Sequence, residues 1–213
     1  LNLPFPPLTT SSCTSALDLA LHLIGVGPGD EVISTPMTCT ATNGVIVNRG
    51  ADIVWGDVNP HSGLLSAEDV ERKITSRTKA IMAVDWGGKL CDYDALKSFG
   101  IPVIQDAAHS FGAGVGGDYV AWSFQAIKFL TTGDGGALLT PLEQLERGRL
   151  LRWYGLDRRS SEFFRCSQDI TEAGFKYHMN DIAAAMGLAN LPMAYRNVNK
   201  QRANAAHYTQ SLL

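Results

Sequence analysis

The sequence lacks the features that mark several large classes of protein. No apolar run approaches the roughly 20 residues of a membrane-spanning helix, and no basic region followed by an apolar core precedes the first helical pattern. The 18 basic and 21 acidic residues nearly cancel, which leaves a net charge of −3. Charge therefore favours neither nucleic acid nor a membrane surface, and we expect no nucleic acid and no membrane among the partners.

Cysteine is scarce and scattered. Cys13, Cys39, Cys91 and Cys166 lie far apart, with no C-x-x-C pair and no nearby histidine at ligand spacing. This pattern argues against a structural zinc site and against a disulfide scaffold, and it is typical of a reducing compartment. We therefore expect a cytoplasmic protein that carries no metal site.

What the sequence does contain is a short-spaced alternation of strand and helix patterns through the first 140 residues. This alternation predicts an α/β fold with a mainly parallel sheet, and no linker or repeat interrupts it, so we expect one domain over residues 1–213. Helices are predicted at 14–25, 40–48, 66–74, 92–99, 141–153, 180–191 and 193–212, and strands at 31–35, 51–58, 79–86, 101–106, 119–124 and 136–140. The predicted helix at 66–74 begins after a cap, Ser66, with Asp69 at the capping-box position.

Two residues are candidates for chemistry. Asp106 ends an apolar strand, and ligands of parallel sheets bind at the carboxyl ends of strands; the alternative is a helix cap. Lys128 lies in an apolar stretch followed by a glycine-rich turn; the alternative is an ordinary surface lysine. Burial among Phe124, Ile127, Phe129 and Leu130 would favour the neutral, nucleophilic amine that attacks a carbonyl.

An anion site is predicted beside them. The segment SSCTSALDLAL opens a helix with a Ser/Thr-rich turn, which directs free N–H groups and the positive dipole end toward an anion. Ser123 precedes Lys128 by five residues. A carboxylate, a lysine, a hydroxyl and a helix start together suit pyridoxal phosphate, because they supply partners for its ring nitrogen, aldehyde and phosphate.

A glycine-rich segment offers a competing interpretation. Residues 112–117 satisfy G-x-G-x-x-G, the fingerprint of a dinucleotide site. That site needs a helix directly after the glycines, whereas DYVAWSF is a strand pattern. We therefore expect a turn here, and a helix after Gly117 would overturn this expectation.

At this point the sequence resembles a known family, the DegT/StrS-type nucleotide-sugar aminotransferases, which are fold-type-I pyridoxal-phosphate enzymes. The resemblance is co-linear over nearly the whole chain. It is carried by SSCTSALDLAL, GPGDEVISTPMTCTAT, TKAIMAVDWGG, VIQDAAHSFGA, SFQAIKFLTTGDGGALLT and GFKYHMNDIAAAMGLANL. It implies a three-layer α/β/α cofactor-binding large domain and transfer of an amino group, usually from glutamate, to a nucleotide-linked keto sugar.

The resemblance also implies roles for single residues. Lys128 would be the Schiff-base lysine and proton shuttle, Asp106 would pair with the pyridinium nitrogen, and His109 would lie near the phenolic oxygen. The phosphate would be held by Thr14, Ser15 and Ser123, and by Lys176 reaching over from the second subunit of a homodimer. Lys176 stands where the commoner pattern has Asn, and His178 where it has Arg.

Several positions depart from the family pattern. Cys39 stands where many members place an aromatic that stacks on the ring, so we expect ring packing from another residue such as His109. Cys13 replaces a glycine of the phosphate motif, and Asp85-Trp86-Gly87 replaces a His-x-Tyr-like pattern on the substrate side. Relatives also extend beyond both ends of this chain, so we expect a large domain truncated at both ends, without the small C-terminal domain.

Two rivals to the aminotransferase remain. A pyridoxal-phosphate sugar dehydratase carries histidine in place of the imine lysine, and Lys128 argues against it. A non-catalytic or regulatory remnant is favoured by the missing ends, but the joint presence of Lys128, Asp106 and Ser123 argues against it.

Overall fold

A computed structural model describes residues 3, 5–159 and 167–212. Its centre is a seven-stranded sheet in the order β1-β7-β6-β5-β4-β2-β3. The strands are β1 (Leu8–Thr10), β2 (Glu31–Ser34), β3 (Asp52–Trp55), β4 (Thr78–Val84), β5 (Val103–Asp106), β6 (Tyr119–Ser123) and β7 (Gly136–Leu139). The helices are α1 (Cys13–Ile24), α2 (Thr40–Asn48), α3 (Ala67–Lys73), α4 (Tyr93–Lys97), α5 (Leu142–Leu151) and α6 (Asp181–Leu212), with a 3₁₀ turn η1 (Trp86–Gly88).

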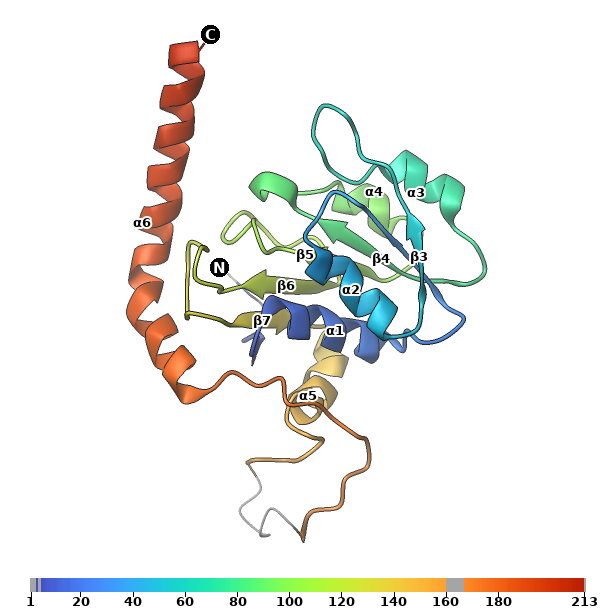
Figure 1. Cartoon of the computed structure of the whole chain (residues 1–213). Coiled ribbons are helices and arrows are strands. Elements are labelled where there is room, and N and C mark those ends of the chain that lie inside the picture. The colour runs from blue at the N-terminus through green and yellow to red at the C-terminus, as the bar shows by residue number, and fades with distance from the viewer. Residues whose placement is uncertain (1–2, 4, 160–166, 213) are drawn as a thin grey trace.

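Helices cover both faces of the sheet, because successive strand residues point to opposite sides. On β4, Ala80 and Met82 pack beneath α1, α2 and α5, whereas Ile81 and Ala83 pack beneath α3 and α4. The second face continues under α6, where Ala194 joins a cluster with Trp122 and Leu139. One layer of helices lies on each face of the sheet (Figure 1), which confirms the α/β class and the three-layer arrangement.

The first helix begins where its sequence predicts. Ser12 adopts an extended backbone, its hydroxyl accepts the Ser15 N–H, and the Ser15 hydroxyl in turn accepts the Ser12 N–H. The helix ends at Gly25, whose φ of 83° is a left-handed conformation that glycine adopts without strain. The start of α1 lies close against β7, since a Cβ on Gly136 would meet the Cys13 nitrogen at 2.6 Å.

The carboxyl ends of three parallel strands form one edge. In register, Val84 of β4 faces Asp106 of β5, and Asp106 faces Ala121 of β6, two residues before Ser123. Because β7 runs antiparallel to β6, it begins at the same edge, with Gly136 opposite Ser123. The contact between Gly136 and α1 therefore brings the helix start to the edge where ligands of parallel sheets bind.

Several details differ from the sequence prediction. The short strand β1 is an addition, and both β1 and β7 are antiparallel to their neighbours. The hydroxyl of Ser66 accepts the Asp69 N–H as expected, but the Asp69 carboxylate binds the Asp57 N–H at 2.7 Å instead of closing a capping box.

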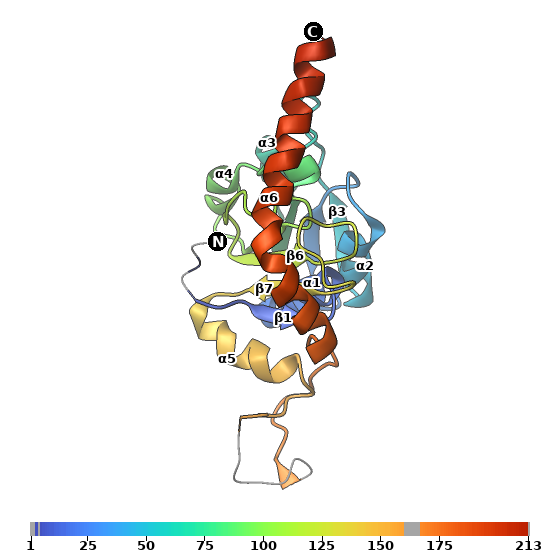
Figure 2. The same ribbon diagram turned by 90° about the vertical axis from the view of Figure 1, so that its left-hand side faces the viewer.

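The two predicted C-terminal helices are one continuous helix, α6, with Pro192 inside it. Proline removes a helical hydrogen bond and usually ends or kinks a helix. Here α6 is anchored on both sides of the proline, because the Asn190 side chain donates to the Thr131 carbonyl and the Asn197 side chain to the Phe129 carbonyl. Figure 2 shows α6 crossing the end of the sheet and continuing beyond the body of the molecule. Within the described ranges, no helix combines the length and the apolar character that crossing a membrane requires.

The glycine-rich segment is a turn, as expected, and not a dinucleotide site. β6 follows it at Tyr119. The N–H groups of Gly116 and Gly117 both donate to the Gln105 side chain, at 2.8 and 3.1 Å. The chain passes so close to the ring of Tyr93 that a Cβ on Gly116 would lie 2.2 Å from it. Close packing therefore explains the glycine at position 116.

This packing predicts a stability difference between two Gly→Ala variants. We expect Gly116→Ala to lower the free energy of unfolding by about 1–3 kcal/mol, because the new methyl group must displace the buried ring of Tyr93. Gly27→Ala is the matched control, since a Cβ there meets nothing within 4 Å, and it should change stability by less than about 1 kcal/mol. Urea unfolding of both variants measures the difference, and equal stabilities would contradict the packing described.

Candidate active site

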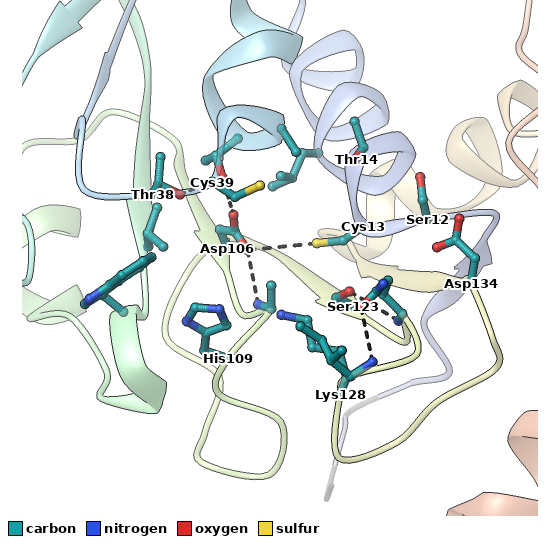
Figure 3. A pocket seen from close by; sticks show the side chains of 18 residues that line it. Ser12, Cys13, Thr14, Thr38, Cys39, Asp106, His109, Ser123, Lys128 and Asp134 are labelled. Atoms are coloured by element: carbon teal, nitrogen blue, oxygen red, sulfur yellow. Dashed lines mark hydrogen bonds between the residues drawn. The ribbon is translucent and has the colours of Figure 1, made fainter.

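A cavity of about 360 Å³ lies at the carboxyl edge of the sheet. Its walls come from the ends of β4, β5 and β6, the first turns of α1 and α2, and the loop between β6 and β7. Figure 3 shows Asp106, Cys13, Cys39, His109 and Lys128 around this common space, with Ser123 nearby. The lining residues include six of the eight predicted cofactor-binding residues: Thr14, Cys39, Asp106, His109, Ser123 and Lys128.

Asp106 is the buried acid of the cavity, with 4% of its surface exposed. Its Oδ2 atom accepts the Thr42 hydroxyl at 2.7 Å, and its Oδ1 atom accepts the Ala108 N–H at 3.1 Å. Burial raises the carboxyl pKa, and the bond from Thr42 is the strongest of the influences that lower it. Among the described residues no lysine, arginine or histidine forms an ion pair with it.

Lys128 lies across the cavity, on the loop between β6 and β7. Its backbone N–H donates to the Gln125 carbonyl at 2.9 Å, which forms a tight turn, and its side chain extends toward Asp106 and His109 (Figure 3). The expected burial of this segment is only partial, because Lys128 is half-buried and Ile127 is 83% exposed. The turn directs Ile127 to solvent and leaves Lys128 on the cavity wall.

His109 is a neutral hydrogen-bond donor in this geometry. Its Nδ1 atom accepts the Gly87 N–H at 3.3 Å, and a backbone N–H can only donate, so the ring proton resides on Nε2. Burial and then the charge of Lys128 lower the pKa of His109, which favours this neutral form. The ring of Trp86 lies 5.3 Å away between centroids, so an aromatic pair lines one wall of the cavity.

The predicted phosphate residues do not all reach the cavity. Thr14 and Ser123 line it, whereas Ser15 does not, because its hydroxyl is engaged in the cap with Ser12. Lys176 is also absent from this wall, and its amine lies 3.8 Å from the ring centre of Trp153. Ser15 and Lys176 instead line a second hollow, of about 440 Å³, between α1, α2 and the segment before α6.

Comparison with known proteins assigns the chain to a family. The model of the DegT/DnrJ/EryC1/StrS aminotransferase family matches residues 7–213. The chain belongs to this family.

Relatives support the assignment. The spore coat polysaccharide biosynthesis protein SpsC of Bacillus subtilis is 36% identical over 86% of this chain and 51% of its own length. The structure of AtS13 from Actinomadura melliaura matches with a TM-score of 0.90 and 41% identity, over 97% of this chain and 60% of that one. The pyridoxal-phosphate form of Spr1654, a putative sugar aminotransferase of Streptococcus pneumoniae, matches with a TM-score of 0.78 and 32% identity, over 87% of this chain and 54% of that one.

The chain spans about half the length of the curated relatives that it matches. In both solved structures compared above, a substantial part of the relative likewise has no counterpart in these 213 residues.

The cavity fits pyridoxal phosphate, the cofactor of this family. A buried carboxylate that pairs with no cation of the described chain is suited to a protonated ring nitrogen. Lys128 stands within reach of the same space, and Thr14 and Ser123 offer hydroxyl groups to a phosphate. Asp106 would hold the ring, Lys128 the aldehyde end, and the start of α1 the phosphate end.

The departures from the family pattern take definite places in the fold. Cys13 is the first residue of α1, Cys39 directly precedes α2, and both line the cavity. Trp86 lines it as well, so an aromatic wall is available although Cys39 cannot stack. Asp85, which the sequence placed on the substrate side, is fully buried and accepts bonds from Tyr93, Gln105 and Ser110. It braces the ends of β4 and β5 and does not face the cavity.

Some polar contributors to the cavity were not singled out from the sequence, among them Thr38, Thr42 and Asp134. Thr38 and Thr42 supply hydroxyl groups from the start of α2, and Asp134 adds a carboxylate from the loop before β7. The sequence did show that Thr38 and Thr42, four residues apart around a predicted helix start, could lie on the same side of that helix. The strand end that they face could not be deduced from that local pattern.

The cavity predicts an order of thiol reactivity. Cys39 is exposed, whereas burial and then Asp106 raise the pKa of the Cys13 thiol, and burial raises the pKa of Cys91 to about 12. Because the thiolate is the reactive form, we expect iodoacetamide at pH 8 to modify Cys39 first among these three. Pyridoxal phosphate should slow that modification. Peptide mass mapping over time measures both effects, and equal rates at Cys39 and Cys91 would contradict the burial described.

Proposed function

We propose that residues 1–213 form the cofactor-binding domain of a pyridoxal-phosphate-dependent aminotransferase that moves an amino group from glutamate to a nucleotide-linked keto sugar. The observation that carries the proposal is that two residues line the same cavity without forming an ion pair. One is the buried carboxylate Asp106, and the other is the lysine Lys128. Membership of the aminotransferase family and the sugar aminotransferases among the solved relatives support it.

The proposed chemistry rests on the division of labour between these two residues. When bound, pyridoxal phosphate supplies an electron sink that stabilises negative charge developing on a substrate carbon. Asp106 keeps the ring nitrogen protonated, because a buried carboxylate strongly favours a nearby positive charge. The Lys128 amine holds the cofactor between turnovers and, once released, moves the proton between the substrate carbon and the C4′ carbon of the cofactor.

The remaining residues position the cofactor in this proposal. The Nε2–H of His109 would donate to the phenolic oxygen, and Trp86 would supply the aromatic surface beside the ring, since Cys39 cannot stack. Thr14 and Ser123 bind the phosphate, assisted by the N-terminus of α1.

A homodimer is part of the same proposal. Lys176 is exposed and lies outside its own chain's cavity, as expected if it reaches the phosphate of a second subunit. Ser15 would then contribute through the cap that shapes the start of α1. The cytoplasm is the proposed location, where the scattered cysteines stay reduced.

Reductive trapping tests the anchor. With pyridoxal phosphate and borohydride, we expect the added mass of the reduced cofactor on the peptide that contains Lys128. Lys128→Ala should abolish this adduct, and Lys79→Ala, at an exposed lysine of β4, should leave it unchanged. A folded chain that gains no adduct on Lys128 would overturn the assignment and favour the non-catalytic alternative.

Comparing two ligands tests the phosphate end. We expect pyridoxal phosphate to bind more tightly than pyridoxal, and Ser123→Ala or Thr14→Ala to reduce that preference about tenfold each, since hydrogen bonds to charged groups are among the stronger ones. Ser98→Ala, at an exposed serine after α4, serves as the control. A variant that weakens both ligands equally would place that hydroxyl away from the phosphate.

A further inference from the structure

The carboxylate of Asp106 is held by a chain of hydroxyl groups that leads to the start of α2. The Thr42 hydroxyl lies 2.7 Å from Oδ2 of Asp106, and the Thr38 hydroxyl lies 2.7 Å from that of Thr42. Thr42 is 1% exposed, whereas Thr38 is half-buried on the cavity wall. This chain of hydroxyl groups therefore leads from the cavity wall to Asp106, the most deeply buried charged group of the site.

The direction of these hydrogen bonds follows from the inventory of donors. An ionised carboxylate can only accept, so the single hydroxyl proton of Thr42 is committed to Asp106. The bond between the two threonines must then be donated by Thr38. Each hydroxyl thus presents its proton toward the carboxylate, an arrangement that favours the charged form of Asp106.

We propose that Thr42 is a positioning residue for Asp106: its hydroxyl, oriented by Thr38, keeps the buried carboxylate ionised and correctly aimed for the ring nitrogen of the cofactor. The inference rests on the proposed role of Asp106 and adds the residue that maintains it. Thr42 touches Asp106 and acts on the cofactor only through it.

Among the side chains near Asp106, Thr42 stabilises the charge of the carboxylate most strongly. Cys13 of α1 approaches Oδ1 with its thiol at 3.9 Å, too far for a strong hydrogen bond, and Tyr93 of α4 is a further titratable neighbour. His109, in the loop after β5, and Lys128, in the loop after β6, face the carboxylate and favour its charge, but less strongly than Thr42 does. The Ala108 N–H is the other close donor, and substitution cannot remove it as cleanly.

The two oxygens of Asp106 are occupied unequally. Oδ1 receives the Ala108 N–H and faces the Cys13 thiol, whereas Oδ2 receives only the Thr42 hydroxyl among the described residues. Because a carboxylate oxygen accepts about two hydrogen bonds, Oδ2 retains room for an incoming N–H donor. Thr42 therefore orients the oxygen that remains available.

The test compares Thr42→Val, which keeps the shape and loses the hydroxyl, with Thr42→Ser, which keeps the hydroxyl. Carbon-13 NMR of the aspartate carboxyls follows Asp106 in the cofactor-free protein, its signal assigned by loss in Asp106→Asn. We expect Thr42→Val to shift the protonation equilibrium about tenfold or more toward the protonated form, with the midpoint at higher pH. Thr42→Ser should titrate like the wild type.

Binding of pyridoxal phosphate, followed by absorbance across the same pH range, is the second readout. Thr42→Val should bind about tenfold more weakly at pH values where only the variant has a protonated Asp106, and the loss should shrink as the pH rises. Thr38→Val should have a smaller effect in the same direction, because solvent at the cavity can replace the outer hydroxyl.

The outcomes separate the inference from the function on which it rests. A folded Thr42→Val protein that titrates like the wild type, or a Thr42→Ser protein with the same defect, would overturn the positioning role. A shifted titration with unchanged cofactor binding at every pH would support the hydroxyl chain and overturn the assignment of Asp106 to the ring nitrogen. Circular dichroism and thermal unfolding establish that each variant is folded.

Discussion

Burying a carboxylate costs several kcal/mol unless hydrogen bonds replace its water, and the way Asp106 meets this cost shapes the site. A salt bridge to a lysine or arginine would have neutralised its charge within the chain. The structure uses neutral donors instead, the Thr42 hydroxyl and the Ala108 N–H, which stabilise the charge without cancelling it. The carboxylate therefore remains able to pair with a cation that arrives from the cavity.

The donors reach Asp106 because the sheet assembles one edge from distant parts of the chain. Asp106 itself comes from the central strand β5, Thr42 from the start of α2 and Lys128 from the loop after β6. The antiparallel strand β7 adds a fourth contributor, since its first residue, Gly136, packs against the start of α1. The ends of β5 and β6 and the starts of α1 and α2 thus line the site, and the loop after β6 supplies the lysine.

A second buried carboxylate, Asp85, has a structural role that contrasts with the ligand-binding role proposed for Asp106. Asp85 follows the strand next to β5 and is as deeply buried as Asp106, yet it is saturated by donors from Cys91, Tyr93, Gln105 and Ser110. The bond from Ser110 ties the segment around His109 to the end of β4, and Gln105, which also donates to Asp85, accepts the N–H groups of the glycine turn. One carboxylate holds the framework together, and the other is left with capacity for a ligand.

The sequence by itself determined the order of strands and helices from α1 to α5, the start of α1, and the placement of Asp106 and Lys128 near one edge, because periodicity, caps and strand ends are local patterns. Tertiary structure decided the rest. The hydrogen bond from Thr42 spans 64 residues and depends on strand register, which no local pattern encodes. The inward turn of Asp85 and the continuity of α6 through Pro192 likewise follow from packing. In each case contacts between remote residues outweighed the preference of the local segment.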